Sequence, residues 1–314
     1  IDLWSPWSRA AIRHVIKNES PDVIITHNLK GIGVGIALEI QQRGVPHIHT
    51  LHDVQLSVPS GLLIAGEEAS FLNRSFLRRW YEAAVKRQIG IPDLVLSPSK
   101  FLVDFYRERG MFTDVRVEVL ANPLPPENRP ELPKTRPQMK TKFLFVGQLE
   151  PHKGVSLLLA SLDQLGEDVE LHFAGEGSLA ECVSDRAQRD IRVTYHGFVS
   201  LNNLVKLLEH IDAVVLPSIC YENSPTVIYE AFLIGVPVIA SRIGGIPELV
   251  EDGVSGLLVA PGNTEELVAA MHRIHNERDV WWKRKTAIRE NAQQYSLETY
   301  VTRLETFMRQ IVEK

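Results

Sequence analysis

Short apolar runs alternate with longer segments of helical character along most of the 314 residues. Continuous apolar runs of this kind are typical of strands buried on both faces of a parallel sheet, and the segments between them predict connecting helices. The pattern therefore predicts an α/β fold with doubly wound parallel sheets. Strands are expected at residues 22–26, 46–51, 93–97, 115–120, 142–146, 169–173, 192–195, 213–216, 236–240 and 256–259.

A proline-rich stretch divides this alternation into two halves. It contains Pro123, Pro125, Pro126, Pro130, Pro133 and Pro137. Proline removes backbone donors and stiffens the chain, which is typical of a linker. We expect an N-terminal domain over residues 1–121, a linker over 122–140 and a C-terminal domain over 141–295. Two such domains would face a cleft at the carboxyl ends of their strands, where open α/β sheets bind ligands.

Composition and charge argue against several classes of protein. The net charge of −5 is not the positive charge that is typical of nucleic-acid-binding domains. Cys182 and Cys220 stand far apart, without the spacing of a metal site, and fit a reducing compartment. No apolar run is long enough to cross a membrane. These features predict a cytoplasmic protein with no nucleic-acid partner.

Two glutamates near a predicted helix start carry the clearest chemistry. Glu222 precedes the helix, and Glu230 follows in an apolar stretch, with seven residues between the two. Ser224 would cap the helix and Pro225 would be its first residue, so the next N–H groups would form an anion site. A hydroxyl acceptor, a phosphate cradle and a second hydroxyl acceptor would then match a nucleotide sugar. Alone, both glutamates could equally be ordinary surface residues.

Four segments around these glutamates resemble one family in order and spacing. They are "FVGQLEPHKGVSLLLAS" from Phe145, "HFAGEGSLAE" from His172, "VTYHGFVSLNNLVKLLEHIDAVVLPS" from Val193 and "ENSPTVIYEAFLIGVPVIASRIGGIPELVEDGVSGLLV" from Glu222. They resemble the retaining glycosyltransferases of the GT-B fold in family 4, the glycogen synthase and mannosyltransferase type. The N-terminal half matches more loosely, through "PDVIITHN" and "HIHTLHD".

The resemblance implies roles for individual residues. Catalysis would depend on His52 near the reacting sugar, Lys153 on the diphosphate and Glu222 on the hydroxyls of the donor sugar. Glu230 would hold the nucleotide ribose. The other donor-binding positions would be Gly147, Gln148, Gly197, Phe198, Asn223, Ser224, Pro225 and Thr226. The family also predicts that the last helix, within residues 296–314, crosses back to the N-terminal domain.

The implied activity is retaining transfer of a hexose-type sugar in polysaccharide biosynthesis. The donor would be a UDP-, GDP- or ADP-linked sugar, and the acceptor a glycan or a lipid-linked molecule. No Asp-x-Asp pair occurs in the chain. Because metal-dependent transferases of the other main fold use such a pair, the sequence predicts a site with no metal and no cofactor.

Two departures from the family pattern keep a second function open. Gln148 stands where the family usually has an arginine that binds the diphosphate. Only about 20 residues precede the first predicted strand, so we expect the N-terminal domain to lack its first β/α units. A catalytically weak or inactive nucleotide-sugar-binding subunit is therefore the alternative.

A glycine series suggests a third interpretation, an NAD-type dinucleotide-binding protein. Gly31, Gly33 and Gly35 follow a predicted strand, and Asp53 follows the next one. Glycine-rich turns of this kind cradle phosphates. The spacing departs from the usual fingerprint, and the glycines could instead allow the close approach of other parts of the protein.

Residues 71–88 predict a basic amphipathic helix. Its apolar positions recur at helical spacing, namely Phe76, Leu77, Trp80, Tyr81, Ala84 and Val85. Five cations, Arg74, Arg78, Arg79, Lys86 and Arg87, stand against the single acid Glu82. Such a helix either packs its apolar side on the sheet or lies on an anionic membrane. The second option predicts a peripheral protein on the inner face of the membrane.

Overall fold

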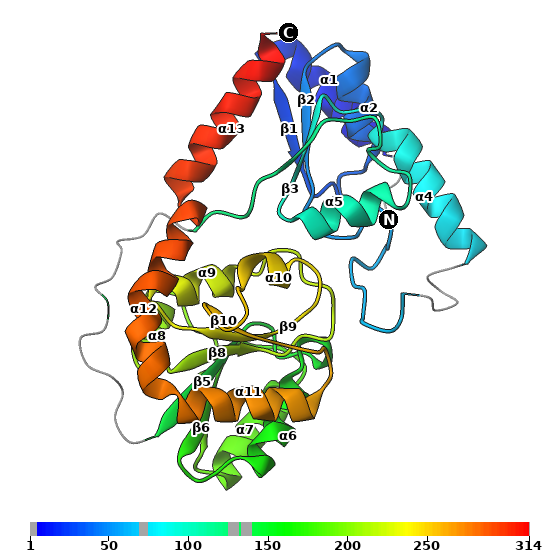
Figure 1. Ribbon diagram of the computed structural model, residues 1–314. Helices are drawn as coiled ribbons and strands as arrows, with labels where there is room; N and C mark the ends of the chain where they lie inside the picture. Colours follow the sequence, from blue (N-terminus) through cyan, green and yellow to red (C-terminus); the bar gives the residue numbers. More distant parts are fainter. Residues whose placement is uncertain (1–4, 69–74, 125–131, 133–139, 314) are drawn as a thin grey trace. The chain divides into compact units, whose positions relative to one another are not determined.

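The computed structural model describes residues 5–68, 75–124, 132 and 140–313. The chain divides into two compact units, each built around one parallel sheet (Figure 1). The first unit comprises residues 1–122 and 298–314, and the second comprises residues 123–297. Most of the linker expected at residues 122–140 lies outside the described residues.

The first unit contains a four-stranded sheet in the order β1-β2-β3-β4. All three strand pairs are parallel. Its strands are β1 (Ile24–His27), β2 (His47–Thr50), β3 (Leu94–Ser97) and β4 (Val117–Val119). Its helices are α1 (Pro6–Glu19), α2 (Gly35–Gln42), α4 (Phe76–Ile89), α5 (Lys100–Arg107) and α13 (Leu297–Val312). The carboxyl ends of all four strands therefore lie at one edge of this sheet.

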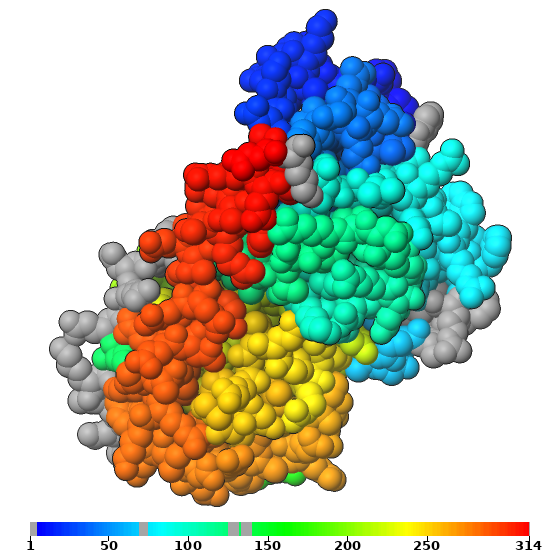
Figure 2. Space-filling view, turned by 45° about the horizontal axis from the view of Figure 1, so that its top comes forward, coloured from blue at the N-terminus to red at the C-terminus, as the bar shows by residue number. Residues whose placement is uncertain are grey.

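The last helix, α13, packs on the sheet of the first unit. Phe307 and Ile311 join Ile48, Leu94 and other buried residues in one apolar cluster. The Arg303 guanidinium donates to the Val119 carbonyl at 2.9 Å. Figure 2 shows α13, in red, lying against the chain around β4. The first unit is thus completed by residues from both ends of the chain.

The second unit contains a six-stranded sheet in the order β10-β9-β8-β5-β6-β7, with every pair parallel. Its strands are β5 (Thr141–Val146), β6 (Val169–Ala174), β7 (Val193–Tyr195), β8 (Ala213–Leu216), β9 (Val238–Ser241) and β10 (Gly256–Val259). Its α-helices are α6 (Val155–Ser161), α7 (Ala180–Arg189), α8 (Leu201–Leu208), α9 (Thr226–Leu233), α10 (Ile246–Leu249), α11 (Thr264–Asn276) and α12 (Arg278–Ala292). Three short 3₁₀ segments complete it, η1 (Pro151–Lys153), η2 (Leu162–Gln164) and η3 (Gln293–Tyr295).

All ten predicted strands are present, each within two residues of its expected ends. Helix α1 was not predicted. It buries none of its residues. Its start does carry a local signal, because the Ser5 side chain accepts a hydrogen bond from the Ser8 N–H and Pro6 is the first helical residue.

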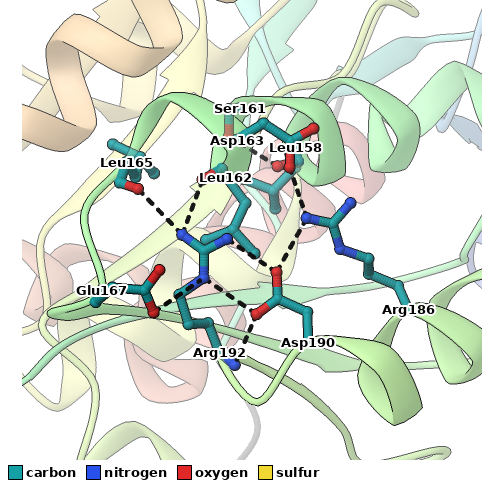
Figure 3. A network of polar contacts seen from close by, with 9 residues as sticks. All are labelled: Leu158, Ser161, Leu162, Asp163, Leu165, Glu167, Arg186, Asp190 and Arg192. Atoms are coloured by element: carbon teal, nitrogen blue, oxygen red, sulfur yellow. Dashed lines mark hydrogen bonds and ion pairs between the residues drawn. The ribbon is translucent and has the colours of Figure 1, made fainter.

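A polar network at the amino end of the second sheet ties two connections together (Figure 3). The Arg192 guanidinium donates to the carbonyls of Leu162 and Leu165, at 3.2 and 3.0 Å, and pairs with Asp190 at 2.9 Å. Arg186 also pairs with Asp190, at 3.0 Å. Hydrogen bonds from Arg192 hold the pKa of Asp190 well below its usual range. This network lies at the edge opposite to the carboxyl ends of the strands and has a structural role.

Helix α4 divides its apolar residues between two faces. Tyr81, Val85 and Ile89 are buried in the first unit, whereas Phe76 and Trp80 are 80% and 60% exposed. The helix, in cyan, lies at the surface in Figure 2. The apolar residues of the predicted helix therefore form two groups, one buried in the first unit and one exposed. Arg74 lies outside the described residues, and no helix among the described residues is long and apolar enough to span a bilayer.

Candidate functional site

The order of strands in the second unit creates a topological switch point between β5 and β8. From β5 the chain proceeds to β6 and β7 on one side, and from β8 to β9 and β10 on the other. Crevices outside the carboxyl ends of such strands are where open α/β sheets bind ligands. The predicted donor-binding residues of this unit follow β5, β7 or β8, so the fold brings them to this edge.

The turn after β5 lies directly against the chain that follows β8. Gly154 ends η1 with a φ of +77°, and a Cβ at this position would lie 2.0 Å from the Pro217 carbonyl oxygen. Only glycine fits both this backbone angle and this approach. The Ile219 N–H also donates to the His152 carbonyl at 2.9 Å. These contacts hold Lys153, the last residue of η1, next to the segment that carries Glu222.

Lys153 and Glu222 form an ion pair across the switch point. The Lys153 Nζ lies 2.5 Å from Glu222 Oε1, and both side chains are about one-fifth exposed. The Ser218 hydroxyl donates to the same carboxylate oxygen at 3.0 Å, and the Cys220 thiol lies 3.8 Å from it. The two groups assigned to the diphosphate and to the donor sugar are therefore within one hydrogen bond of each other. Ser218 and Cys220 were not predicted.

The backbone of Glu222 is held by the turn after β9. The Gly245 N–H donates to the Glu222 carbonyl at 2.7 Å. The Gly244-Gly245 pair of the quoted segment thus has a structural role, because its backbone holds the main chain of Glu222. The next residue, Asn223, continues the same loop toward α9.

The start of α9 differs by one residue from the prediction. The expectation that Ser224 caps the helix and Pro225 begins it is wrong: Pro225 is the cap, in an extended conformation, and the helix begins at Thr226. The Ser224 hydroxyl is buried and hydrogen-bonds the Tyr229 hydroxyl. Ile228 makes the first turn's hydrogen bond, to the Pro225 carbonyl. The N–H groups of the first helical residues precede that bond and form the anion-binding end of the helix.

Glu230 lies on α9 one turn beyond this helix start. Burial raises the pKa of its carboxyl, and a hydrogen bond with the Thr226 side chain partly opposes the rise. Half-buried carboxylates normally have a cationic partner, yet none of the ion pairs found among the described residues involves Glu230. A ligand hydroxyl that donated to this carboxylate would supply the missing stabilisation.

The turns after β5, β6 and β7 are hydrogen-bonded to one another at this edge. The Gly147 N–H donates to the Ala174 carbonyl at 3.0 Å, and the Gly175 N–H donates to the Gly197 carbonyl at 2.8 Å. Phe198 follows Gly197 and is 74% exposed. Its exposed ring is available to a nucleobase, the role that the resemblance implies. Gln148 is also exposed, beside Gly147.

In the first unit, His52 lies just after β2 and forms a pair with His27 at the end of β1. The His27 Nδ1 and His52 Nε2 atoms are 3.0 Å apart. Burial lowers the pKa of both imidazoles; the neighbouring ring lowers that of His27 further, and Asp53 partly offsets the effect at His52. His27 was not predicted, because the pair depends on the register of two strands whose residues are 25 apart in sequence. His52 also lines a pocket of about 270 Å³ within this unit.

One glycine of the dinucleotide interpretation, Gly35, has protein partners in the first unit. The Arg9 Nε of α1 donates to the Gly35 carbonyl at 3.1 Å, and its Nη2 donates to the Gln88 side chain of α4 at 3.1 Å. Asp53 accepts a hydrogen bond from the Gln55 N–H at 2.7 Å. These contacts favour helix packing and a local turn over a cofactor site. Throughout the described ranges, no cluster of three His, Cys, Asp or Glu side chains could hold a metal ion.

Residues 128–295, more than half of the chain, match the family described as glycosyl transferases group 1. The chain belongs to this family. Residues 2–128 match the description Glycosyltransferase Family 4. The chain has the GT-B fold, with two parallel-sheet α/β units.

Two named relatives match most of this chain. It is 29% identical over 287 residues to a glycogen synthase of Mycobacterium tuberculosis, covering 86% of this chain and 64% of the relative. It is 27% identical over 277 residues to the MMP alpha-(1->4)-mannosyltransferase of Mycolicibacterium hassiacum, covering 83% and 64%. The chain thus spans less than two thirds of the length of these curated relatives.

The fold is shared with a solved structure of Anabaena Alr3699/HepE in complex with UDP. The TM-score is 0.77 at 21% identity, and the match covers 96% of this transferase and 82% of that chain. At this level of identity the likeness shows the fold.

Proposed function

We propose that this transferase moves a hexose-type sugar from a nucleotide-sugar donor to a glycan or lipid-linked acceptor, with retention of configuration and without a metal. The observation that carries the proposal is the geometry at the β5/β8 switch point. There Lys153 and Glu222 are 2.5 Å apart, beside the start of α9, and Glu230 lies one helical turn further on. The UDP and UDP-glucose complexes of HepE and the names of the relatives support this donor class.

In this proposal, each residue of the site binds a different part of the donor. Glu230 accepts hydroxyls of the ribose, and Phe198 with Gly197 lies against the base. The Thr226 and Val227 N–H groups and the Lys153 ammonium receive the diphosphate, where they stabilise the charge that develops as the glycosidic bond breaks. Glu222 accepts hydroxyls of the transferred sugar. In this arrangement Lys153 and the helix dipole provide the positive charge that a divalent cation supplies elsewhere.

Isothermal titration with UDP, GDP and ADP tests the donor assignment and identifies the base. We expect one nucleotide to bind, and Glu230→Gln to weaken it by about tenfold, because hydrogen bonds to a charged group are worth about 1.5–3 kcal/mol. Glu222→Gln is expected to weaken the nucleotide sugar more than the nucleotide. Glu290→Gln, on α12 of the same unit, is the matched control. If wild type bound none of the three nucleotides, the proposed function would be wrong.

Gln148 favours the second candidate, a binding subunit with little turnover. An arginine at this position would add a charge-assisted contact to phosphate, about twice as strong as a neutral one. Gln148→Arg is therefore expected to tighten nucleoside-diphosphate binding by about 1 kcal/mol, measured by titration at low salt. An unchanged dissociation constant would mean that residue 148 does not face the diphosphate. Gln164→Arg, also on the second unit, controls for the added charge.

The exposed apolar end of α4 supports a membrane-borne acceptor. Phe76, Leu77 and Trp80 are exposed there, with Arg79 and Lys86 exposed on the same helix. Aromatic and cationic residues together favour an anionic lipid surface. On this basis we place the transferase in the cytoplasm, bound peripherally to the inner face of the membrane.

Liposome flotation tests this placement. We expect the chain to float with vesicles containing anionic lipid at low salt and to remain behind with neutral vesicles. A Phe76→Ser/Trp80→Ser variant should lose flotation, because each burial of a large apolar side chain contributes about 1.5–3 kcal/mol. Val280→Ser, another exposed apolar position, should float like wild type. Equal flotation of wild type and the α4 variant would contradict the proposed surface.

A further inference from the structure

Three hydrogen-bond donors converge on one oxygen of the Glu222 carboxylate. The Lys153 ammonium lies 2.5 Å from Oε1, the Ser218 hydroxyl donates to the same atom at 3.0 Å, and the Cys220 thiol lies 3.8 Å from it. Among the described residues, the second oxygen, Oε2, takes part in no hydrogen bond or ion pair. A carboxylate oxygen can accept two hydrogen bonds. The protein thus holds one oxygen and leaves the other to a ligand.

A bound diphosphate would compete for one of these donors. The Lys153 ammonium is the group assigned to the diphosphate, and phosphate oxygens attract this cation as the Glu222 carboxylate does. The Cys220 thiol stays protonated, because burial and then the neighbouring carboxylate raise its pKa to about 11, but a thiol is a weak donor. The Ser218 hydroxyl is therefore the donor on which Oε1 depends most when the diphosphate site is occupied.

The position of the Ser218 hydroxyl is set by the main chain on both sides. Ser218 is 2% exposed and lies two residues after β8. Before it, the Pro217 carbonyl lies against Gly154, where a Cβ would come within 2.0 Å of the carbonyl oxygen. After it, the Ile219 N–H donates to the His152 carbonyl at 2.9 Å. Both contacts tie this segment to the η1 turn, so the hydroxyl has little freedom to move relative to the carboxylate.

We propose that Ser218 is a positioning residue for the donor sugar: its hydroxyl holds Oε1 of Glu222 so that Oε2 faces the sugar and accepts a hydrogen bond from one of its hydroxyls. The inference rests on the proposed function, in which Glu222 binds the transferred sugar. Ser218 is buried, so it acts through the carboxylate and not by contact with the ligand.

Holding one carboxylate oxygen prepares Glu222 for the sugar. The Gly245 N–H fixes the Glu222 main chain through a hydrogen bond of 2.7 Å but leaves the torsions of the side chain free. The last of these torsions has a broad energy well, so an unheld carboxylate would turn easily. A group that is ordered before binding loses less entropy on binding. Removing the hydroxyl should therefore weaken a nucleotide sugar, which occupies both the diphosphate and the sugar positions, and spare a nucleoside diphosphate.

Isothermal titration of Ser218→Ala and wild type tests this difference. The probes are UDP, GDP and ADP, and the nucleotide sugars UDP-glucose, GDP-mannose and ADP-glucose. For the base that wild type binds, we expect Ser218→Ala to weaken the nucleotide sugar by about tenfold and the nucleoside diphosphate by less than about twofold. Equal loss of affinity for both ligands, or no loss for either, would overturn the proposal.

Two further serine variants separate the hydroxyl from the packing around it. Ser218→Thr retains the hydroxyl and should recover most of the affinity for the nucleotide sugar. Ser241→Ala is the matched control, because Ser241 ends β9, is 1% exposed and has no hydrogen-bond partner for its hydroxyl among the described residues. This control should bind both ligands as wild type does. A folded Ser218→Thr variant that binds the nucleotide sugar as weakly as Ser218→Ala would contradict the role of the hydroxyl.

A double-mutant cycle shows whether Ser218 acts through Glu222. In a Glu222→Ala background the acceptor of the hydroxyl is gone, so Ser218→Ala should change the affinity for the nucleotide sugar by less than about twofold. A further loss of about tenfold in this background would mean that Ser218 acts independently of Glu222, which would overturn the proposal. The melting temperature of each variant is measured alongside. If Ser218→Thr or Glu222→Ala does not fold, the difference between the two ligands in Ser218→Ala decides.

The same titrations separate this inference from the proposed function. Wild type that bound no nucleotide would contradict the proposed function and this inference with it. Nucleotide binding without binding of any of the three nucleotide sugars would contradict the sugar-binding role of Glu222, on which the inference rests. Equal affinities of Ser218→Ala and wild type for both ligands would overturn the inference alone and leave the assignment of the donor site to the second unit intact.

Discussion

Replacing Lys153 with alanine is expected to slow release of nucleoside diphosphate from the donor by about 10²- to 10³-fold. This is the usual loss when one preorganised donor to a developing negative charge is removed. Lys153 is the ammonium at the β5/β8 switch point, paired with Glu222 at 2.5 Å. Without this ammonium, only the N–H groups of α9 would stabilise the negative charge on the leaving group. Donor hydrolysis, followed by diphosphate release, measures the effect without a known acceptor.

Controls for this prediction must separate chemistry from folding. Lys153→Ala leaves the half-buried Glu222 carboxylate without its cation, so the melting temperature of each variant is needed alongside its rate. Lys153→Arg retains the charge and should recover part of the activity. Lys283→Ala removes an exposed lysine of α12 and should react as wild type does. A rate for Lys153→Ala within a factor of about three of wild type would show that Lys153 does not act on the leaving group.

Acidification from pH 7 to about pH 4.5 is expected to destabilise the first unit by about 5 kcal/mol through His47 and His49. Burial lowers the pKa values of these imidazoles in the folded state to about 4 and about 3. In the unfolded chain both titrate near 6.5. Between these values the unfolded state binds more protons, so stability falls as the pH decreases. Above pH 7 both states are neutral and the contribution disappears.

Urea unfolding of the chain at a series of pH values, monitored in the first unit, measures this loss. Histidine NMR provides the direct control, since neither His47 nor His49 should titrate between pH 7 and pH 5. The folded imidazoles are held neutral by their burial, and both contact the Thr26 hydroxyl between them. A flat stability profile, or titration of either ring near its ordinary pKa, would show that the His47 and His49 imidazoles are not held neutral by burial.

Several strands could be predicted from the sequence because they are continuous apolar runs, whereas β2 and β4 include polar residues. β3 and β8 are buried along their whole length, so no alternation of polar residues obscures them. Helix α1 lacks any such signal because all its residues remain at least partly accessible. The two faces of α4 could not be separated either, since Phe76 and Tyr81 are both apolar and only packing in the first unit distinguishes them.

The candidate site could be predicted where one motif carries it and not where distant segments meet. Glu222, the α9 start and Glu230 come from one stretch, so the sequence alone places them near one another. The exact cap of α9, Pro225, could not be predicted. The pairing of Lys153 with Glu222 joins residues 69 apart in sequence, and only the order of the strands places them together.

A crystal structure of the chain soaked with the nucleotide sugar that titration identifies would test the central claim most directly. We expect the diphosphate at the Thr226 and Val227 N–H groups and the Lys153 ammonium, with the ribose hydroxyls on Glu230. The sugar should lie within hydrogen-bonding distance of Glu222. A nucleotide bound instead at the Gly31–Gly35 turn of the first unit would contradict the assignment of the donor site to the second unit.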